Sequence, residues 1–332
     1  MEQNSLLTTE QTALDQNGNF IYEVADAPEQ GTEKWLAWRK LGITATEAAS
    51  IMAPSDWGSP LKVYTDKLGI TQNDQSDPNG FFEWGHRVED LLVTKFMEQH
   101  PNFTRCTQGR LYQRDWMKCS LDAQCFDENG QPVIIECKTG TSLSKWDPIP
   151  TRYFAQIQWQ MLVTGIRKAY FSVLIVEGGW NWFEKEVEFS PTYVGQMLSK
   201  CGDVWGCIQS KTPPKALANP EADKTAIAGI AGETGHLGSP VEVDEDTVAK
   251  YKQLKEAADK ADEAFATFKN ELGLKLLDVQ KLVCKGKTFA SWVERKGAVT
   301  IDKTILQQRF PEVYAQVTKQ GLPTRYIRFN DK

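Results

Sequence analysis

Residues 121–138 read LDAQCFDENGQPVIIECK, and this segment limits the possible folds of the chain more than any other. Two β-prone runs flank an Asp-Glu-Asn-Gly turn, which is typical of a β-hairpin. A hairpin of this length places Asp122 roughly opposite Glu136. Because side chains alternate along a strand, Glu136 and Lys138 project from the same face. The segment therefore predicts two carboxylates and an ammonium group at one edge of a sheet.

This group of side chains suits metal-assisted hydrolysis of a phosphodiester. Carboxylates hold divalent cations, and a lysine orients the attacking water or helps to deprotonate it. The alternative is a solvated strand end, which is the commoner origin of a single Glu-x-Lys pattern. The run from Val133 to Ile135 favours the first interpretation, because a buried strand that leads directly into Glu136 leaves its charge in need of a partner or a metal.

A second candidate site lies upstream, in WLAWRKLGITATEAASIM (residues 35–52). We expect Thr46 to be the N-cap of a helix that has Glu47 near its start. The free N–H groups of a helix N-terminus, a hydroxyl group and Arg39 can together bind a phosphate. An ordinary capped helix with an exposed arginine is the commoner meaning of such a segment when it stands alone.

Two further segments have helical periodicity. In residues 81–96 the apolar side chains form one stripe that we expect to be buried: Trp84, Val88, Leu91, Leu92 and Phe96. Glu89 lies beside this stripe and is either an ion-pair partner or a further ligand for a metal or a water. Residues 152–165 predict a helix that ends at Gly165 and carries Gln156 and Gln160 on one polar face. A second hairpin is expected over 168–189.

In order and approximate spacing, five motifs resemble those of bacteriophage lambda exonuclease and the YqaJ-type viral recombinases, a branch of the restriction-endonuclease-like PD-(D/E)xK nucleases. The motifs are Arg39 with ITATEA, WGHRVE, S-L-D, E-C-K and AQIQWQM, and the similarity covers about residues 35–190. The resemblance implies an α/β, restriction-endonuclease-like core with a mixed central sheet flanked by helices. It also implies 5′→3′ digestion of one strand of linear double-stranded DNA, which leaves 3′ single-stranded overhangs for single-strand annealing recombination.

The resemblance also implies roles for individual residues. The residues that match the family's catalytic group are Asp122, Glu136, Lys138 and Gln156. The matches to the ligands of two Mg²⁺ ions, which Mn²⁺ can replace, are Glu89, Asp122, Glu136 and the backbone carbonyl of Cys137. The matches to the residues that bind the 5′-phosphate are Arg39, Thr46 and, more weakly, Ser120. Leu121 stands where the motif expects proline, but this departure removes no functional group.

The activity has two alternatives. An endonuclease of the same fold would cut closed circular DNA, and a non-catalytic scaffold for DNA ends would not digest DNA at all. The net charge of −6 argues against unselective coating of a polyanion, so local positive groups must bind DNA. The candidate positive side chains are Arg39, Lys62, Lys67, Lys145 and Arg152. Trp57 and Trp146, on expected loops, either contact bases or serve as packing anchors.

We expect three parts along the 332-residue chain: a nuclease core over 1–210, a linker rich in proline and glycine over 211–240, and a mainly helical module with a small hairpin over 241–332. The module contains an apolar seam with alternating spacings of three and four residues, formed by Tyr251, Leu254, Ala258, Ala261, Phe265, Phe268 and Leu272. Such a seam packs on its own module, on another subunit or on another protein.

The expected location is the cytosol of a bacterial host, in a phage or prophage protein. The polar start MEQNSLLTTEQT does not resemble a signal peptide, and no apolar run reaches the roughly 18 residues of a membrane span. Seven cysteines without C-x-x-C spacing favour reduced thiols. The expected partners are double-stranded DNA ends and a single-strand annealing protein, and the resemblance implies a homo-oligomer, specifically a trimer.

Overall fold

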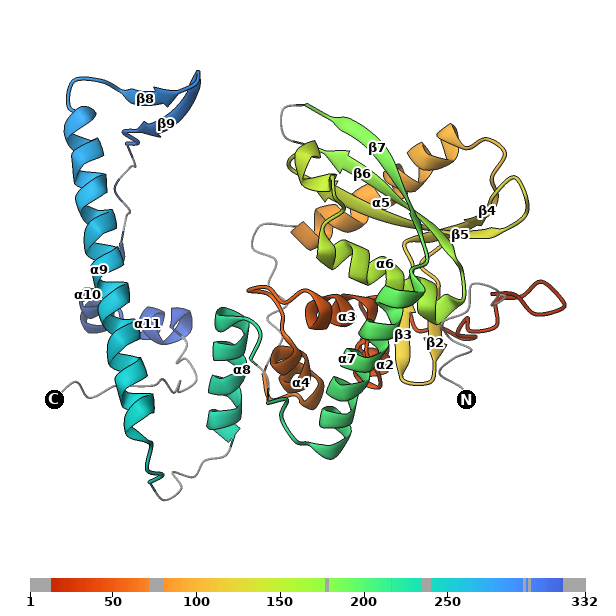
Figure 1. Cartoon of the computed structure of the whole chain (residues 1–332), viewed down its shortest axis with the longest axis horizontal. Helices are drawn as coiled ribbons and strands as arrows, with labels where there is room; N and C mark the ends of the chain where they lie inside the picture. The colour runs from red at the N-terminus through yellow and green to blue at the C-terminus, as the bar shows by residue number, and fades with distance from the viewer. Residues whose placement is uncertain are drawn as a thin grey trace. The chain divides into compact units, whose positions relative to one another are not determined.

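The structure is a computed structural model of the chain, and it describes residues 13–71, 81–176, 179–215, 217–233, 240–294, 297 and 300–318. The chain forms two compact units (Figure 1). The first extends to Gly235 and also includes Thr324–Lys332, and the second is His236–Pro323. The two units are described separately below.

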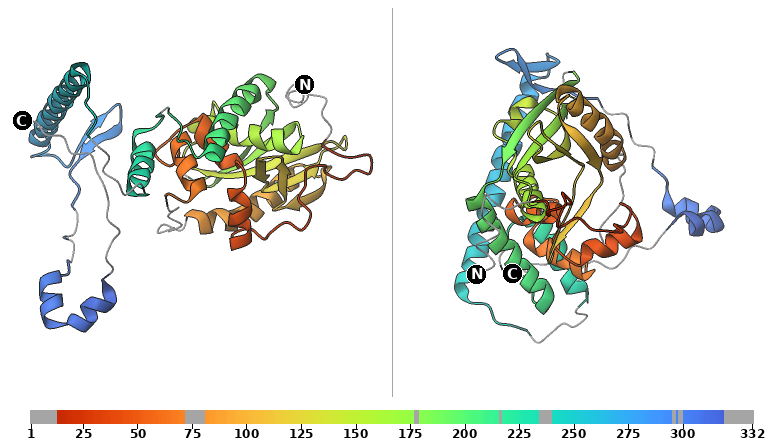
Figure 2. Two further views of the ribbon diagram at one scale, coloured as in Figure 1. Left: turned by 90° about the horizontal axis from the view of Figure 1, so that it is seen from below. Right: turned by 90° about the vertical axis from the view of Figure 1, so that its right-hand side faces the viewer.

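A five-stranded mixed sheet forms the centre of the first unit. In spatial order its strands are β1 (Thr104–Gln108), β4 (Ala123–Phe126), β5 (Pro132–Gly140), β6 (Lys168–Ile175) and β7 (Asn181–Glu188). Neighbouring strands are antiparallel except β5 and β6, which are parallel. A parallel pair needs a crossover connection, and α6 (Thr151–Thr164) supplies it. Both views in Figure 2 show helices beside these strands.

Alternate residues of β5 pack on opposite sides of the sheet. Val133 and Ile135 belong to the apolar cluster of α5 (Phe81–Gln99), whereas Ile134 belongs to the larger cluster that contains residues of α6. The other helices of the unit are α2 (Glu33–Lys40), α3 (Ala45–Met52), α4 (Pro60–Leu68), α7 (Pro191–Ser210) and α8 (Pro220–Glu233). A two-stranded sheet, β2 (Leu111–Arg114) with β3 (Met117–Ser120), and a short 3-10 helix, η1 (Leu143–Trp146), complete it.

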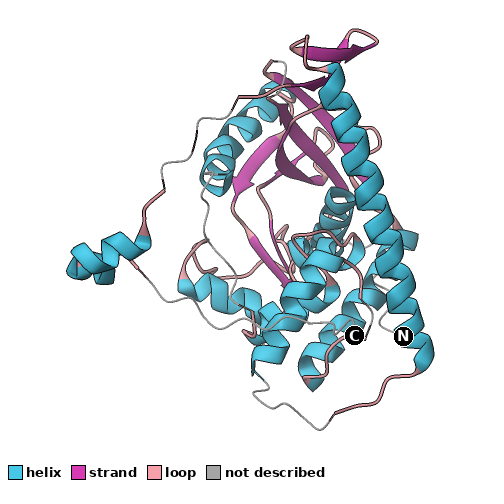
Figure 3. Cartoon of the chain, turned by 90° about the vertical axis from the view of Figure 1, so that its left-hand side faces the viewer, coloured by secondary structure: helices cyan, strands magenta, loops and turns pink. Residues whose placement is uncertain are grey.

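The fold class expected from the sequence is confirmed, because a mixed central sheet lies among helices (Figure 3). Both hairpins are also confirmed. In the first, Asp127 Oδ1 accepts hydrogen bonds from the N–H groups of Asn129 and Gln131, and Gly130 turns the chain with a positive φ of 73°. This φ lies in the region that favours glycine, as the Asp-Glu-Asn-Gly pattern predicts.

The stripe expected to be buried on α5 is only partly correct. Leu92 and Phe96 are buried and Val88 is half-buried, but Trp84 and Leu91 are 65% and 67% exposed. Successive residues are about 100° apart around a helix. Leu91 and Trp84, which are seven residues apart, therefore share a face that lies to one side of the buried one.

The expectation of a linker over 211–240 is wrong for residues 220–233, which form α8. This helix packs on α4, and Asp223 connects the two helices. The Oδ1 atom of Asp223 accepts a hydrogen bond from the Oγ of Ser59, the N-cap of α4, at 2.6 Å. Its Oδ2 accepts from the N–H groups of Ala218 and Asn219 at 2.6 and 2.8 Å. The helix therefore belongs to the first unit. The proline and glycine residues in and around it made the segment resemble a linker in the sequence.

The second unit contains a long helix, α9 (Glu245–Lys275), and a hairpin of β8 (Lys281–Cys284) and β9 (Lys287–Ser291). Two short helices follow, α10 (Lys303–Arg309) and α11 (Pro311–Val317). The small hairpin and the mainly helical character of this module agree with the sequence prediction. Residues 319–332 of the expected C-terminal module lie outside the described residues.

The predicted apolar seam of α9 is exposed within its unit. No residue of α9 is buried, and Leu254, Phe265 and Phe268 are 60%, 58% and 45% exposed. Among the residues that the structure describes, no helix is both long enough and apolar enough to cross a membrane. All seven cysteines are free.

Candidate active site

The β4–β5 hairpin brings the predicted carboxylates together. Ala123 pairs with Ile135 in the antiparallel register, so the next residues outward, Asp122 and Glu136, lie opposite each other. The Cys137 N–H donates to Asp122 Oδ2 at 2.7 Å, which holds this carboxylate against β5. Glu136 and Lys138 lie on the same side of β5 as Ile134 and so face the α6 side of the sheet.

Glu136 is only 1% exposed, and three donors occupy its carboxylate. Lys138 Nζ and Gln156 Nε2 donate to Oε1, the latter at 2.6 Å, and Gln160 Nε2 donates to Oε2 at 2.7 Å. The two glutamines are one turn apart on α6. Burial of a carboxylate is costly unless such partners are present, so Lys138 and the two amides make this position possible for Glu136.

Gln160 was not among the site residues expected from the sequence. Besides Glu136, it contacts the Ser120 carbonyl, to which Nε2 donates at 3.2 Å, and its own Oε1 is buried without a hydrogen-bond partner. The available signal was its spacing of four residues from Gln156, which places both amides on one helix face. The same pattern on a surface helix would have no such role.

Burial and neighbouring charges both shift the pKa of Asp122, and burial has the larger effect. Burial raises the pKa of Asp122 well above its usual value, the charges of Glu136 and Glu89 raise it further, and Lys138 opposes them. Burial lowers the pKa of Lys138, but the Glu136 and Asp122 carboxylates outweigh burial and raise it above the usual value. The lysine is therefore an ammonium ion at neutral pH, and the carboxylates favour a further cation.

The oxygen donors of this cluster suit a hard divalent cation such as Mg²⁺. Glu89 lies on α5, where the Cys137 thiol contacts its carbonyl at 3.7 Å, and its carboxylate is near enough to raise the pKa of Asp122. Within the described part of the chain, no three His, Cys, Asp or Glu side chains converge into a ready metal-binding group. The negative charge and the oxygen atoms of these carboxylates fit a divalent metal ion. To bind it, Glu136 would have to release one of its three present donors, Lys138, Gln156 or Gln160.

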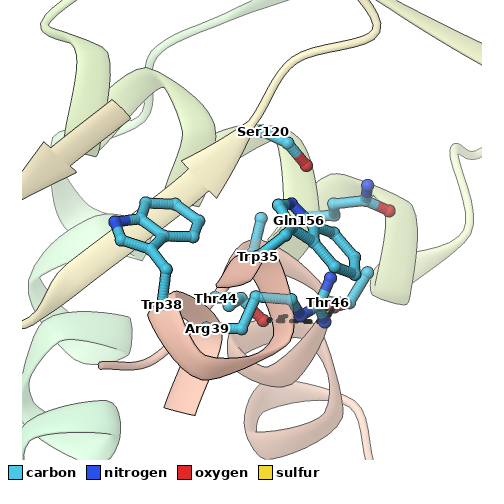
Figure 4. A pocket seen from close by; sticks show the side chains of 8 residues that line it. Trp35, Trp38, Arg39, Thr44, Thr46, Ser120 and Gln156 are labelled. Atoms are coloured by element: carbon cyan, nitrogen blue, oxygen red, sulfur yellow. Dashed lines mark hydrogen bonds between the residues drawn. The ribbon is translucent and has the colours of Figure 1, made fainter. Parts of the chain in front are cut away.

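A small pocket adjoins this cluster (Figure 4). The residues that line it are Trp35, Trp38, Arg39, Thr44, Ala45, Thr46, Ser120 and Gln156. Arg39 donates through one guanidinium nitrogen to Thr46 Oγ1 at 3.3 Å and to Thr44 Oγ1 at 3.5 Å, and it lies over the Trp35 ring at 4.5 Å. The pocket thus brings together the three residues predicted to bind a phosphate: Arg39, Thr46 and Ser120.

The predicted helix cap is wrong by two residues. Thr44, not Thr46, is the N-cap of α3, with extended backbone angles and an N–H that donates to Glu47 Oε2 at 2.8 Å. The glutamate three residues after the cap is a capping-box position, which favours Thr44 over Thr46. Thr46 lies in the first turn, where its hydroxyl still contacts Arg39.

The pocket and the carboxylate cluster share side chains. Gln156 lines the pocket and also donates to Glu136, and the Ser120 carbonyl accepts from Gln160. The two candidate sites, which lie far apart in the sequence, therefore form one continuous site. Trp35, Trp38 and Thr44 were not predicted as members of it. Of the two tryptophans expected on loops, Trp57 is 87% exposed, whereas Trp146 ends η1, is buried and stacks on Tyr153.

Comparisons with known proteins agree with this class of site. Residues 34–167 match the family model of the YqaJ-like viral recombinase domain. The match agrees with the family expected from the sequence motifs, and it supports a nuclease that acts in recombination.

One curated relative and two solved structures are also similar. The "Uncharacterized protein YqaJ" of Bacillus subtilis (strain 168) is 25% identical over 321 residues, which is 93% of this chain and 97% of that protein. An alkaline exonuclease of Laribacter hongkongensis is 17% identical, with a TM-score of 0.44 over 54% of this chain and 94% of its own. A phage-related exonuclease of Haemophilus somnus 129PT is 8% identical, with a TM-score of 0.39 over 52% and 96%.

Proposed function

We propose that this protein is a Mg²⁺-dependent exonuclease that digests one strand of linear double-stranded DNA in the 5′→3′ direction. The observation that supports this most is the continuity of the site. A pocket with the Arg39 guanidinium and three hydroxyl side chains adjoins a cluster of carboxylates and a lysine, and Gln156 belongs to both. A terminal phosphate in the pocket would place the first phosphodiester beside the cluster, as digestion from a 5′ end requires.

Each part of the site has a chemical task in this proposal. Asp122, Glu136, Glu89 and the Cys137 carbonyl would hold Mg²⁺, or Mn²⁺ in its place, and the bound ions would stabilise negative charge on the scissile phosphate. Gln156 and Gln160 hold Glu136 in one orientation. The Lys138 ammonium, close to Glu136, can donate a hydrogen bond to the attacking water.

Arg39, Thr46 and Ser120 would bind the 5′-phosphate. A guanidinium makes charge-assisted hydrogen bonds to phosphate that are stronger than those between neutral groups. A 5′-hydroxyl end offers no charge to this pocket, so the proposal includes a preference for 5′-phosphorylated ends.

The test is digestion of linear duplex DNA, labelled on each strand in turn, with and without Mg²⁺. We expect the 5′-phosphorylated strand to be digested, and we expect Lys138→Ala to reduce the rate by at least about a hundredfold, as for loss of an acid–base group. The control is Lys95→Ala, which removes a partly exposed lysine of α5 that pairs with Glu98 on the same helix. Wild-type cutting of closed circular DNA would indicate an endonuclease, and no digestion at all would indicate a scaffold.

We further propose that the protein acts in a bacterial cytosol with a single-strand annealing protein that binds the exposed 3′ overhang. Pairing of digestion with annealing fits the viral recombinase domain found over residues 34–167. Assembly into a homo-oligomer, with a trimer as the expected form, is part of the same proposal.

A further inference from the structure

Lys67 was expected to face DNA, but the structure places it behind the pocket. Its side chain, on α4, is only 3% exposed, and it is not among the residues that line the pocket. Lys67 Nζ lies 2.7 Å from Glu47 Oε2 and donates to the Arg39 carbonyl at 2.6 Å. A buried ammonium in this position cannot bind DNA directly. It does contact α2 and α3, the two helices that carry Arg39 and Thr46.

These contacts connect two walls of the pocket. Arg39 lies in the last turn of α2, where carbonyl groups lack partners within the helix, and Lys67 supplies the partner for its carbonyl. Glu47 Oε2, which Lys67 also contacts, accepts from the N–H of Thr44 at the start of α3. One ammonium group thus ties the end of α2 to the start of α3, and both Arg39 and Thr44 line the pocket.

Lys67 also has an electrostatic effect. Glu47 lies in the first turn of α3, next to the pocket-lining Thr46, and its side chain is 20% exposed. A carboxylate this close to a phosphate pocket opposes anion binding, since like charges repel most strongly where water is scarce. An ammonium group 2.7 Å away cancels that repulsion.

We propose that Lys67 is a positioning residue that sets the selectivity of the pocket for a terminal phosphate over a hydroxyl. It does so by neutralising Glu47 and by tying Glu47 to the carbonyl of Arg39. This inference rests on the proposed binding of a 5′-phosphate in the pocket. It is independent of cleavage, because none of the groups involved belongs to the carboxylate cluster.

The experiment measures binding of the full-length protein to blunt linear duplexes that differ only in a 5′-phosphate or a 5′-hydroxyl, in EDTA so that no cleavage occurs. The readout is the ratio of the two dissociation constants. We expect Lys67→Met to reduce the preference for the phosphate roughly tenfold, as for loss of one charge-assisted interaction. Lys168→Met is the matched control, since Lys168 also pairs with a carboxylate, that of Glu186, and does not line the pocket.

Glu47→Gln separates the charge effect from loss of folding. The amide can still accept from the Thr44 N–H, so we expect this variant to keep or increase the preference, and we expect Lys67→Met with Glu47→Gln to recover part of what Lys67→Met loses. A wild-type ratio in Lys67→Met, an equal loss of preference in the control Lys168→Met, or no recovery in the double variant would overturn the inference. If Lys67→Met does not fold, a loss of preference in Glu47→Gln overturns it instead.

The same measurements distinguish this inference from the proposed function. A wild-type protein that prefers phosphorylated ends in EDTA but digests nothing with Mg²⁺ supports the role of Lys67 and contradicts the exonuclease. A wild-type protein that digests duplex DNA but binds both ends equally contradicts the role of Lys67.

Discussion

At the residue scale, the carboxylate cluster opposes the stability of the fold that contains it. Burial and the charges of Glu136 and Glu89 raise the pKa of Asp122, so the ionised form of Asp122 is less stable in the folded chain than in the unfolded one. The free energy of unfolding therefore falls as the pH rises above the unfolded value of 3.8, and the loss is complete above the folded pKa. Functional sites often carry such a cost.

Asp122→Asn should therefore stabilise the metal-free protein while it removes nuclease activity. The amide oxygen can still accept from the Cys137 N–H, and one of the like charges is gone. We expect the Tm in EDTA at pH 7.5 to rise by about 2–4 °C, which corresponds to about 1 kcal/mol in a unit of this size. The check is thermal unfolding of both proteins at pH 4 and pH 7.5. A Tm gain that does not grow with pH would contradict this origin of the effect.

Several site residues could be predicted because their placement depends on local structure. Asp122, Glu136 and Lys138 lie on one hairpin, whose turn residues and alternating pattern determine which side chains share a face. Gln160 and Lys67 could not be assigned in the same way. The contacts of Lys67 with Glu47 and Arg39 join separate helices, and a sequence pattern does not distinguish a lysine that packs inward from one that faces solvent.

At the element scale, a buried carboxylate anchors α8. Asp223 is 3% exposed and accepts from Ser59 Oγ and from two backbone N–H groups. Asp223→Ala leaves these donors without a partner, at a cost of about 1–3 kcal/mol for a buried group. We expect the Tm to fall by at least about 4 °C.

The control for this change is Glu221→Ala in the same helix. Glu221 makes an exposed ion pair with Lys224. Exposed pairs contribute at most about 1 kcal/mol, so its Tm should hardly change. Equal Tm values for the two variants would show that α8 is not anchored through Asp223.

The result also decides where the first unit can be shortened. A chain that ends at residue 210 lacks α8, whereas one that ends at 235 keeps it.

Element boundaries were predictable where end signals are local and unambiguous. Gly165 ends α6 with a positive φ of 80°, as its place after a helical pattern predicted. The start of α3 was misplaced because two threonines, Thr44 and Thr46, compete for the cap, and Glu47 favours the first. Helix α8 was missed because its apolar residues are alanines and isoleucines, with Gly229 and Gly232 among them, and give only a weak helical pattern.

At the scale of the whole molecule, the second unit carries large apolar side chains that its own fold does not bury. Phe265 and Phe268 on α9 are 58% and 45% exposed, and Leu254 is 60% exposed. Burial of such a side chain contributes roughly 1.5–3 kcal/mol, so this stripe provides a strong tendency to associate. Within the proposed function, its partner is the single-strand annealing protein that binds the exposed overhang.

Substitution in the full-length chain tests this docking. We expect Phe265→Glu with Phe268→Glu to digest linear duplex at the wild-type rate, because the candidate active site lies in the first unit. The same variant should fail to retain a purified annealing protein from the same genome in a pull-down. The matched control is Gln253→Glu with Asn270→Glu, which adds the same charge at two exposed polar positions of α9 and should retain it. If the phenylalanine variant instead unfolds at lower temperature, or changes its mass by light scattering, the stripe packs within the chain or between copies, and the docking proposal is wrong.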